Sequence, residues 1–369
     1  MDEELALFHS LKESQQLLSL LQHIDKILSL APFTDRQYNF MEICGTHTVS
    51  IMKYGFRNYF KGRIKFLSGP GCPVCVTSQR DIDKVIALTK MGIRIVTFGD
   101  LIKVPGSKSS LEEQMTLGRK VDVVYNPLDC LKIATDSDEE IVFIAVGFET
   151  TIPVIASLVL DAEKMGIKNF SILPLMKTIP NSLDFLLSNL ENEIDGFICP
   201  GHVSVIIGEH PYRIIPEKYG IPCVIAGFEP VDIGLALESL LSQILTQNPI
   251  VDNRYKRVVK ENGNPSAIGL ITEVFEKTDV EWRGFGEISA SGMKLREKFN
   301  EYDAENKFNI KIDTFLEPKG CICGEIVAGK KHPLDCTLFA KKCTPDSPVG
   351  PCMVSYEGAC SAFYKYGEP

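Results

Sequence analysis

The residues best suited to chemistry in this chain are cysteines, and they crowd its carboxyl end. The sequence has 369 residues and 12 cysteines. Six of them lie close together near the end: Cys321, Cys323, Cys336, Cys343, Cys352 and Cys360. A thiol cluster in a chain without a secretory signal is more often a metal or redox site than a disulfide framework. The spacing fits neither a ferredoxin run nor a simple zinc ribbon, so a [4Fe–4S] cluster plus one dithiol and a structural zinc site both remain open.

A second candidate site lies in the phrase MEICGTHT, where a predicted strand ends and a helix begins. Cys44 occupies this junction, and His47 follows three residues later. A thiol at a helix N-terminus has its thiolate stabilised by the helix dipole and free N–H groups, so we expect a lowered pKa. His47 is a candidate base for the thiol or lies on the approach to a bound metal. The alternative is a buried cysteine that packs like a small hydrophobic residue.

The phrase SGPGCPVC repeats this placement, because it also follows a predicted strand and precedes a helix. Cys72 and Cys75 form a CxxC pair at the helix start. Two thiols at this spacing can close a small disulfide or share a metal ion. The glycines allow the tight turn that such a loop needs. We therefore predict a redox or metal-binding pair.

The phrase DGFICPGHVS supplies another cysteine and histidine at a predicted strand end, Cys199 and His202. Here a core cysteine and a histidine that caps the turn form an equally strong alternative. Cys130 and Cys223 lie in apolar surroundings, and we interpret both as core residues.

Composition narrows the class of protein. The chain is 44% hydrophobic and 24% charged with a net charge of −9, which argues against nucleic acid as a partner. No run approaches the roughly 18 apolar residues that a membrane span requires, and the acidic start is unlike a signal peptide. We expect a cytoplasmic protein without a membrane segment, with its thiols in a reducing compartment.

The elements that must position these residues alternate along the chain. Leucines recur at helical spacing in residues 8–30, which predicts an amphipathic helix. Short apolar runs bounded by glycine and proline predict eight strands, at 38–44, 63–68, 93–99, 121–125, 140–147, 170–175, 195–200 and 221–227. Helical stretches separate them, and strands alternating with helices predict parallel sheets.

The predicted organisation is an α/β fold with two parallel-sheet units followed by a cysteine-rich C-terminal region. The divisions are an N-terminal helix at 1–32, α/β domains at 33–133 and 134–248, and the cysteine-rich domain at 249–369.

Ligands of parallel sheets bind outside the carboxyl ends of the strands. We therefore expect Cys44, Cys72, Cys75 and Cys199 to gather in one cleft. Glu149 and Glu229, in two GFE phrases, are predicted at the same edge as candidate substrate anchors or partners of Lys103; a solvated turn carboxylate is the favoured alternative for each.

Taken together, the phrases CGTH, GPGCPVC, GFETT, CPGHVS and the carboxyl-terminal cysteine pattern resemble the HypD family of [NiFe]-hydrogenase maturation factors. The resemblance spans essentially the whole chain. It implies two parallel-sheet α/β domains that flank a cleft, followed by a C-terminal cysteine-rich iron–sulfur domain. It implies a redox-active scaffold rather than a simple turnover enzyme, on which the Fe(CN)2CO group is assembled. It also implies a stable complex with HypC and a transient one with HypE, the cyanide donor.

The same resemblance implies roles for individual residues. Cys44 would hold the iron of Fe(CN)2CO together with a cysteine of HypC, and Cys72 and Cys75 would be a dithiol on the electron or cyanide route. Cys321, Cys336, Cys343 and Cys360 would hold a [4Fe–4S] cluster, which leaves Cys323 and Cys352 as a redox pair. Glu357, one turn before Cys360, is a candidate functional carboxylate; an ordinary helix-start glutamate is the alternative.

Two other classes of function remain open from the residues alone. One is a free-standing iron–sulfur thiol–disulfide oxidoreductase, indicated by the CxxC pair and the spare tail cysteines. The other is a zinc-stabilised binding module without redox activity, indicated by the tail spacing. No GxSxG, HExxH, P-loop or GxGxxG phrase occurs, so hydrolytic and nucleotide chemistry have no support in the sequence.

Overall fold

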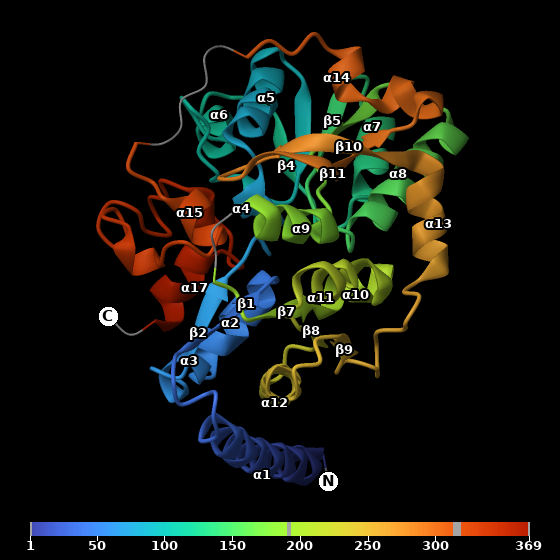
Figure 1. Cartoon of the computed structure of the whole chain (residues 1–369). Helices are drawn as coiled ribbons and strands as arrows, with labels where there is room; N and C mark the ends of the chain where they lie inside the picture. The colour runs from blue at the N-terminus through green and yellow to red at the C-terminus, as the bar shows by residue number, and fades with distance from the viewer. Residues whose placement is uncertain (1, 190–192, 313–318, 368–369) are drawn as a thin grey trace.

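A computed structural model gives an α/β architecture with two parallel β-sheets, one antiparallel hairpin and a cysteine-rich tail (Figure 1). The structure describes residues 2–189, 193–312 and 319–367, with side chains from residue 14 onward. The predicted α/β class with parallel sheets is therefore confirmed.

The larger sheet has five parallel strands. Their order across the sheet is β2 (Ile64–Ser68), β1 (Tyr38–Glu42), β7 (Gly196–Pro200), β8 (Cys223–Ala226) and β9 (Val251–Asn253). Strand β1 pairs with β2 from Tyr38 opposite Ile64 to Glu42 opposite Ser68. All five strands therefore end at the same edge, and the segments that follow them meet there.

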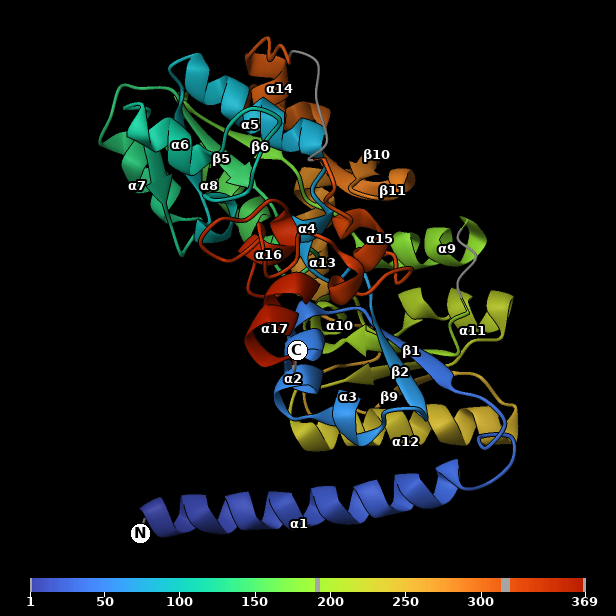
Figure 2. The ribbon, with the colours of Figure 1, turned by 90° about the vertical axis from the view of Figure 1, so that its left-hand side faces the viewer.

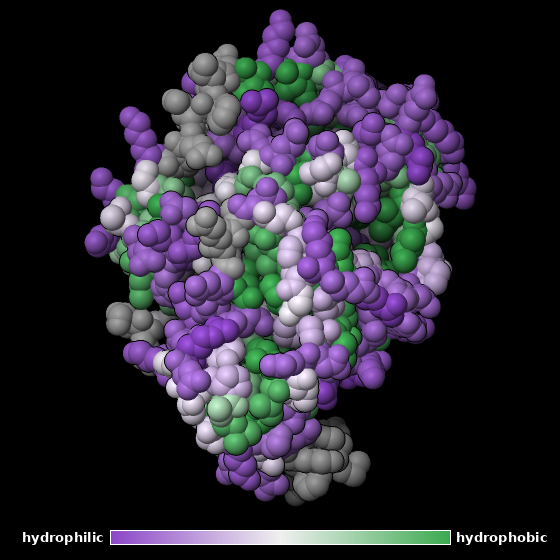
Figure 3. Space-filling model, in the orientation of Figure 1, coloured by the Kyte–Doolittle hydropathy of each residue, from purple (hydrophilic) through white to green (hydrophobic). Residues whose placement is uncertain are grey.

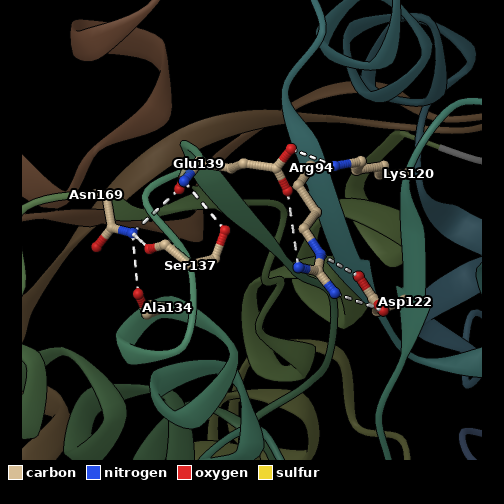
Figure 4. A network of polar contacts seen from close by, with 7 residues as sticks. All are labelled: Arg94, Lys120, Asp122, Ala134, Ser137, Glu139 and Asn169. Atoms are coloured by element: carbon tan, nitrogen blue, oxygen red, sulfur yellow. Dashed lines mark hydrogen bonds and ion pairs between the residues drawn. The ribbon is translucent and has the colours of Figure 1, made fainter.

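The second sheet has four parallel strands, in the order β4 (Val121–Val123), β3 (Arg94–Thr97), β5 (Ile141–Ala145) and β6 (Phe170–Pro174). A polar network ties the beginnings of these strands together (Figure 4). Arg94 on β3 makes two hydrogen bonds to Asp122 on β4, at 2.6 and 3.1 Å, and also contacts Glu139 before β5. The side-chain amide of Asn169 closes the neighbouring turn by donating to three backbone carbonyls.

All eight predicted strands are present, and β9 is an additional short one. The residues of the inner strands are almost entirely buried because helices cover both faces of each sheet, whereas the edge strands β4 and β9 are partly exposed. Phe40, Ile198 and Val224 face one core of the five-stranded sheet, whereas Met41 and Phe197 face the other.

The chain does not visit the two sheets in sequence order. It leaves the five-stranded sheet after β2, builds the whole four-stranded sheet with β3 to β6, and returns with β7. The sequence-based division at residue 133 does not follow this path, because β3 and β4 pair with β5 and β6. The connections that change sheets and those that stay within one sheet have the same strand–turn–helix pattern. The local sequence therefore does not indicate where the chain changes sheets.

Helices and short 3₁₀ turns connect the strands. The helices are α1 (Asp2–Leu28), α2 (Gly45–Lys53), α3 (Phe56–Tyr59), α4 (Pro73–Val76), α5 (Gln79–Lys90), α6 (Leu111–Thr116), α7 (Asp129–Thr135), α8 (Ile152–Met165), α9 (Ile179–Asn189), α10 (Gly201–Ile207), α11 (Ile214–Tyr219), α12 (Pro230–Thr246), α13 (Pro265–Val274), α14 (Ala304–Lys307), α15 (Cys323–Val327), α16 (Pro351–Val354) and α17 (Ala359–Tyr366). The amphipathic helix predicted at 8–30 is α1. It packs outside α12 (Figure 2), with Leu20 against the position of Gly234.

Residues 249–307 differ from the prediction of one cysteine-rich unit from 249 onward. Strands β10 (Phe275–Trp282) and β11 (Gly286–Leu295) form an antiparallel hairpin that joins the core around the four-stranded sheet through Phe275, Met293 and Leu295. The tail from 319 to 367 contains only short helices and turns, and five of its six cysteines, all but Cys336, pack in a core shared with α4 and α5. The alternating pattern of the hairpin was not recognised in the sequence.

None of the described helices is long and apolar enough to cross a bilayer. Hydrophilic residues cover most of the face in Figure 3, and hydrophobic ones show through between them.

Candidate functional site

Cys44 lies at the junction of β1 and α2, where it occupies the N-cap position of the helix. Its side chain is only 8% exposed. The loop after β2 covers it: the N–H of Gly45 donates to the carbonyl of Gly71 at 3.2 Å. A Cβ atom on Gly71 would lie 2.5 Å from the Cα of Cys44, so glycine is what allows this approach. The CGTH and GPGC phrases are therefore in direct contact.

Glu357 reaches the same place from the far end of the chain. The hydroxyl of Thr46 donates to its Oε1 at 2.8 Å. The main chain at Glu357 also presses on α2, because a Cβ on Gly45 would lie 2.3 Å from its carbonyl oxygen. The carboxylate is thus held beside Cys44 by α2 and by the turn that precedes α17.

The pKa of Cys44 is raised to about 12, which contradicts the lowered pKa predicted from its helix position. Burial is the largest cause, and the negative charge of Glu357 is the second. The hydroxyl and backbone N–H of Thr46 and the backbone N–H of His47 favour the thiolate, but they are outweighed. At neutral pH Cys44 is a protonated thiol, so it must lose its proton on binding a cation.

His47 is buried and its ring is held by the segment after β8. Its Nε2 lies 2.9 Å from the carbonyl oxygen of Gly227. A carbonyl can only accept, so this nitrogen carries the proton, and Nδ1 is left as a buried acceptor without a hydrogen-bond partner among the described residues. Burial lowers the pKa of His47 to about 4, which keeps the ring neutral. The ring stacks on Phe228, with centroids 4.6 Å apart.

Cys72 and Cys75 form a disulfide, with their Cα atoms 5.2 Å apart. Cys72 is the N-cap of α4, and both cysteines are buried. Helix α4 packs against α15 and α16 of the tail. The disulfide therefore lies between the Cys44 loop and the cysteine-rich tail.

The tail brings its cysteines together around Cys323. The thiols of Cys321, Cys352 and Cys360 donate hydrogen bonds to it and lower its pKa, while the pKa of each donor is raised. Cys343 lies nearby and accepts the N–H of Val349 at 3.3 Å.

Cys336 is half-buried, like Cys321, and has its sulfur 3.9 Å from the carbonyl oxygen of Gly320. Within residues 2–189, 193–312 and 319–367, no three side chains of His, Cys, Asp or Glu are arranged to hold a metal ion. The structure gathers the tail cysteines but does not divide them into cluster ligands and a dithiol.

Similarity to known proteins identifies the family of this chain. Residues 16–367 match the HypD family, described as the hydrogenase formation hypA family. The chain belongs to the HypD family. It is 44% identical over 344 residues to a putative hydrogenase expression/formation protein of Methanocaldococcus jannaschii, covering 93% of this chain and 96% of that one. It is 42% identical over 340 residues to the hydrogenase maturation factor HypD of Rhodobacter capsulatus, covering 90% of each chain. The predicted resemblance to HypD is thus confirmed.

Of the four cysteines that were predicted to gather in one cleft of this HypD-family chain, Cys199 has the position least suited to binding a ligand. It lies in β7 with no exposure, beside Cys223 of β8, whose pKa is raised by burial and by this neighbour. This position favours the packing interpretation of Cys199. His202 instead lies at the start of α10, where its ring stacks on Phe228 with centroids 4.0 Å apart. Phe228 thereby places both histidines of the HypD phrases side by side.

The two GFE glutamates act as helix caps rather than as free anchors in this HypD-family chain. Glu149 is buried and accepts the N–H of Ile179 at the start of α9, and burial raises its pKa to about 7. Glu229 forms a capping box with Asp232 at the start of α12. The glutamate of each GFE phrase therefore stabilises the start of a helix.

Two residues near Cys44 were missed by the sequence analysis. Asp100 follows β3 in the four-stranded sheet, lies 3.5 Å from the hydroxyl of Ser355, and helps to raise the pKa of Glu357. Tyr356 is 60% exposed beside them, and the pKa of its phenol is raised by burial and by Glu357. Asp100 belongs to VTFGD, which, like the two GFE phrases, places an acidic residue after a strand and a glycine. This recurrence is the signal in the sequence that could have identified Asp100.

The contact between Gly45 and Glu357 leads to a stability prediction. We expect Gly45→Ala to destabilise the fold by about 1–3 kcal/mol, because the new methyl group meets backbone atoms that cannot move aside easily. The matched control is Gly269→Ala in α13, where nothing lies within 4 Å of the new Cβ. That change should stabilise the protein by about 0.5–1 kcal/mol. Urea unfolding measures both, and equal effects of the two changes would disprove the close contact.

Proposed function

We propose that this chain is a maturation scaffold on which, together with HypC and HypE in the cytoplasm, the Fe(CN)2CO group of a [NiFe] centre is assembled. Membership of the HypD family supports the pathway. The observation that carries the proposal is the placement of Cys44, Glu357 and the Cys72–Cys75 disulfide around one edge of the five-stranded sheet.

In this proposal the two sheets belong to two domains that flank a cleft at Cys44, and the tail is an iron–sulfur domain. Iron with its cyanide and CO ligands is the cargo, and the thiolate of Cys44 is its anchor. A soft thiolate in an enclosed site suits an iron that carries strong-field ligands. HypC would contribute a second thiolate as a stable partner, and HypE would bind transiently to deliver cyanide.

Proton transfer is assigned to the residues beside Cys44. Its thiol, with a pKa near 12, must release a proton when it binds iron. Glu357 is the nearest carboxylate, and burial raises its pKa, which makes it a better proton acceptor than a surface glutamate. The buried Nδ1 of His47 and the ring of His202 would orient groups bound next to the thiolate.

Electron transfer is assigned to the disulfide and the tail. Opening the Cys72–Cys75 disulfide consumes two electrons and two protons and yields two thiols, and the Cys323–Cys352 pair is assigned the same exchange. A [4Fe–4S] cluster would supply these electrons one at a time, held by Cys321, Cys336, Cys343 and Cys360. The donor set fits, because thiolates are the ligands of such clusters. Gly350 also leaves the space free, since a Cβ there would lie 2.5 Å from the sulfur of Cys321.

Anaerobic purification tests this proposal. We expect brown protein with about four iron and four sulfide ions per chain, as a [4Fe–4S] site requires. Cyanide and CO infrared bands should then appear in its complex with HypC. Colourless protein with one zinc ion per chain would contradict the proposal and favour a zinc-stabilised binding module.

The Cys72–Cys75 disulfide favours a second candidate, a free-standing thiol–disulfide oxidoreductase. That function requires catalytic turnover with a soluble disulfide or thioredoxin in the absence of HypC. Turnover that appears only in the complex would exclude it.

A further inference from the structure

A groove separates the edge of the five-stranded sheet from the cysteine-rich tail. Its volume is about 450 Å³. One wall is β2 with the loop after α3, and the other is the segment 329–335 with the end of α17. Figure 1 shows β2 and α3 next to α17 at the lower left of the molecule. We call this space the β2–tail groove; it is separate from the Cys44 site.

The β2–tail groove is basic in a chain whose net charge is −9. Lys61 and Lys65 line one wall, and Lys330 and Lys331 line the other. All four are exposed, and none makes an ion pair or side-chain hydrogen bond to another described residue. Among the described residues that line the groove, Asp335 is the only carboxylate, and it accepts the N–H of His332.

The positive charge of the groove lowers the pKa of a histidine that lines it. The pKa of His332 is lowered to about 4, first by burial and then by the charges of Arg57 and Lys65, against the opposing effect of Asp335. Arg57 already has a partner, because it forms a 3.0 Å ion pair with the buried carboxylate of Glu42. The four lysines are therefore the charges left for a ligand.

Protection of the sheet edge explains only part of this arrangement. β2 is an edge strand, and one outward lysine such as Lys65 is enough to discourage pairing with another chain. Lys330 and Lys331 are not on the sheet at all. A full added strand is also blocked, because the guanidinium of Arg57 already donates to the carbonyl of Phe66 at 2.7 Å.

We propose that the β2–tail groove binds an acidic, extended segment of a partner protein. Carboxylates of the segment would pair with lysines on both walls, and its apolar side chains would cover Leu334, which is 53% exposed. The four lysines are mobile point charges spread over two walls, so they suit a segment whose several carboxylates can each meet a different lysine. This proposal does not depend on the cluster or on Cys44.

Binding of a defined peptide to the full-length protein tests the proposal. The probe is a fluorescein-labelled 12-residue peptide that alternates glutamate with leucine or valine, followed by fluorescence anisotropy. We expect binding that weakens about tenfold or more between about 20 and 200 mM NaCl, because exposed charges are screened. The variant Lys61→Gln, Lys65→Gln, Lys330→Gln, Lys331→Gln should bind at least about tenfold more weakly.

The matched control changes four exposed lysines outside the groove: Lys90→Gln, Lys132→Gln, Lys164→Gln and Lys260→Gln. It carries the same net charge as the groove variant and should retain binding. Equal loss of peptide binding in both variants would mean that overall charge, and not the groove, causes the binding. That result would overturn the proposal. Absence of peptide binding to the unaltered protein, or displacement of the peptide by submillimolar inorganic phosphate or ATP, would overturn it as well. Thermal unfolding of both variants checks that the fold is intact.

Discussion

Replacing Cys44 by alanine should abolish hydrogenase maturation, lowering the activity of the hydrogenase by at least about 100-fold. The change removes the anchoring sulfur that we assign to iron, and neither neighbour replaces a thiolate: His47 has an imidazole hydrogen-bonded to Gly227, and Glu357 has a carboxylate hydrogen-bonded to Thr46. The measurement is hydrogenase activity in a host that lacks its own HypD-family protein and carries the variant instead.

The matched control for Cys44→Ala is Cys130→Ala. Cys130 is also buried, but it lies on α7 in the core around the four-stranded sheet, where its thiol has no assigned role. Both changes remove one buried sulfur and should cost a similar, small amount of stability, about 1 kcal/mol. A Cys44→Ala protein that matures hydrogenase as well as the Cys130→Ala protein does would refute the anchoring role.

The strands were predictable because their signal is local. Most of the apolar runs are bounded by glycine or proline and are buried on both faces, as in β5 and β7, so their composition indicates their environment. The order of the strands was not predictable in the same way. The helical crossing from β2 to β3 changes sheets, while that from β5 to β6 does not, and the two have the same local pattern. Which sheet a strand joins is decided by packing between distant segments.

The pKa of Cys44 was predicted in the wrong direction for a related reason. Its position at a helix start is visible in the sequence, and that position does favour the thiolate. The opposing effects come from elsewhere: the loop at Gly71 buries the sulfur, and Glu357 arrives from 311 residues beyond Thr46. A local motif can place a thiol at a strand end, but its electrostatics depend on what the fold packs over it.

Single alanine replacements in the tail should divide the six cysteines into two groups. We expect Cys321→Ala, Cys336→Ala, Cys343→Ala and Cys360→Ala to lose the brown colour and most of the iron, because each removes a cluster ligand. Cys323→Ala and Cys352→Ala should keep about four iron ions per chain and lose only the redox exchange assigned to this pair. Iron and sulfide content with visible absorption spectra, measured anaerobically, gives the partition.

The pair Cys323→Ala and Cys336→Ala decides this prediction. The thiol of Cys323 contacts those of Cys321, Cys352 and Cys360, so these four could equally form a ligand set that excludes Cys336. Under that alternative, Cys323→Ala would be colourless and Cys336→Ala brown. Under our assignment the outcomes are reversed, because Cys336 is a cluster ligand and Cys323 is not. The two assignments therefore predict opposite iron contents for the same two proteins.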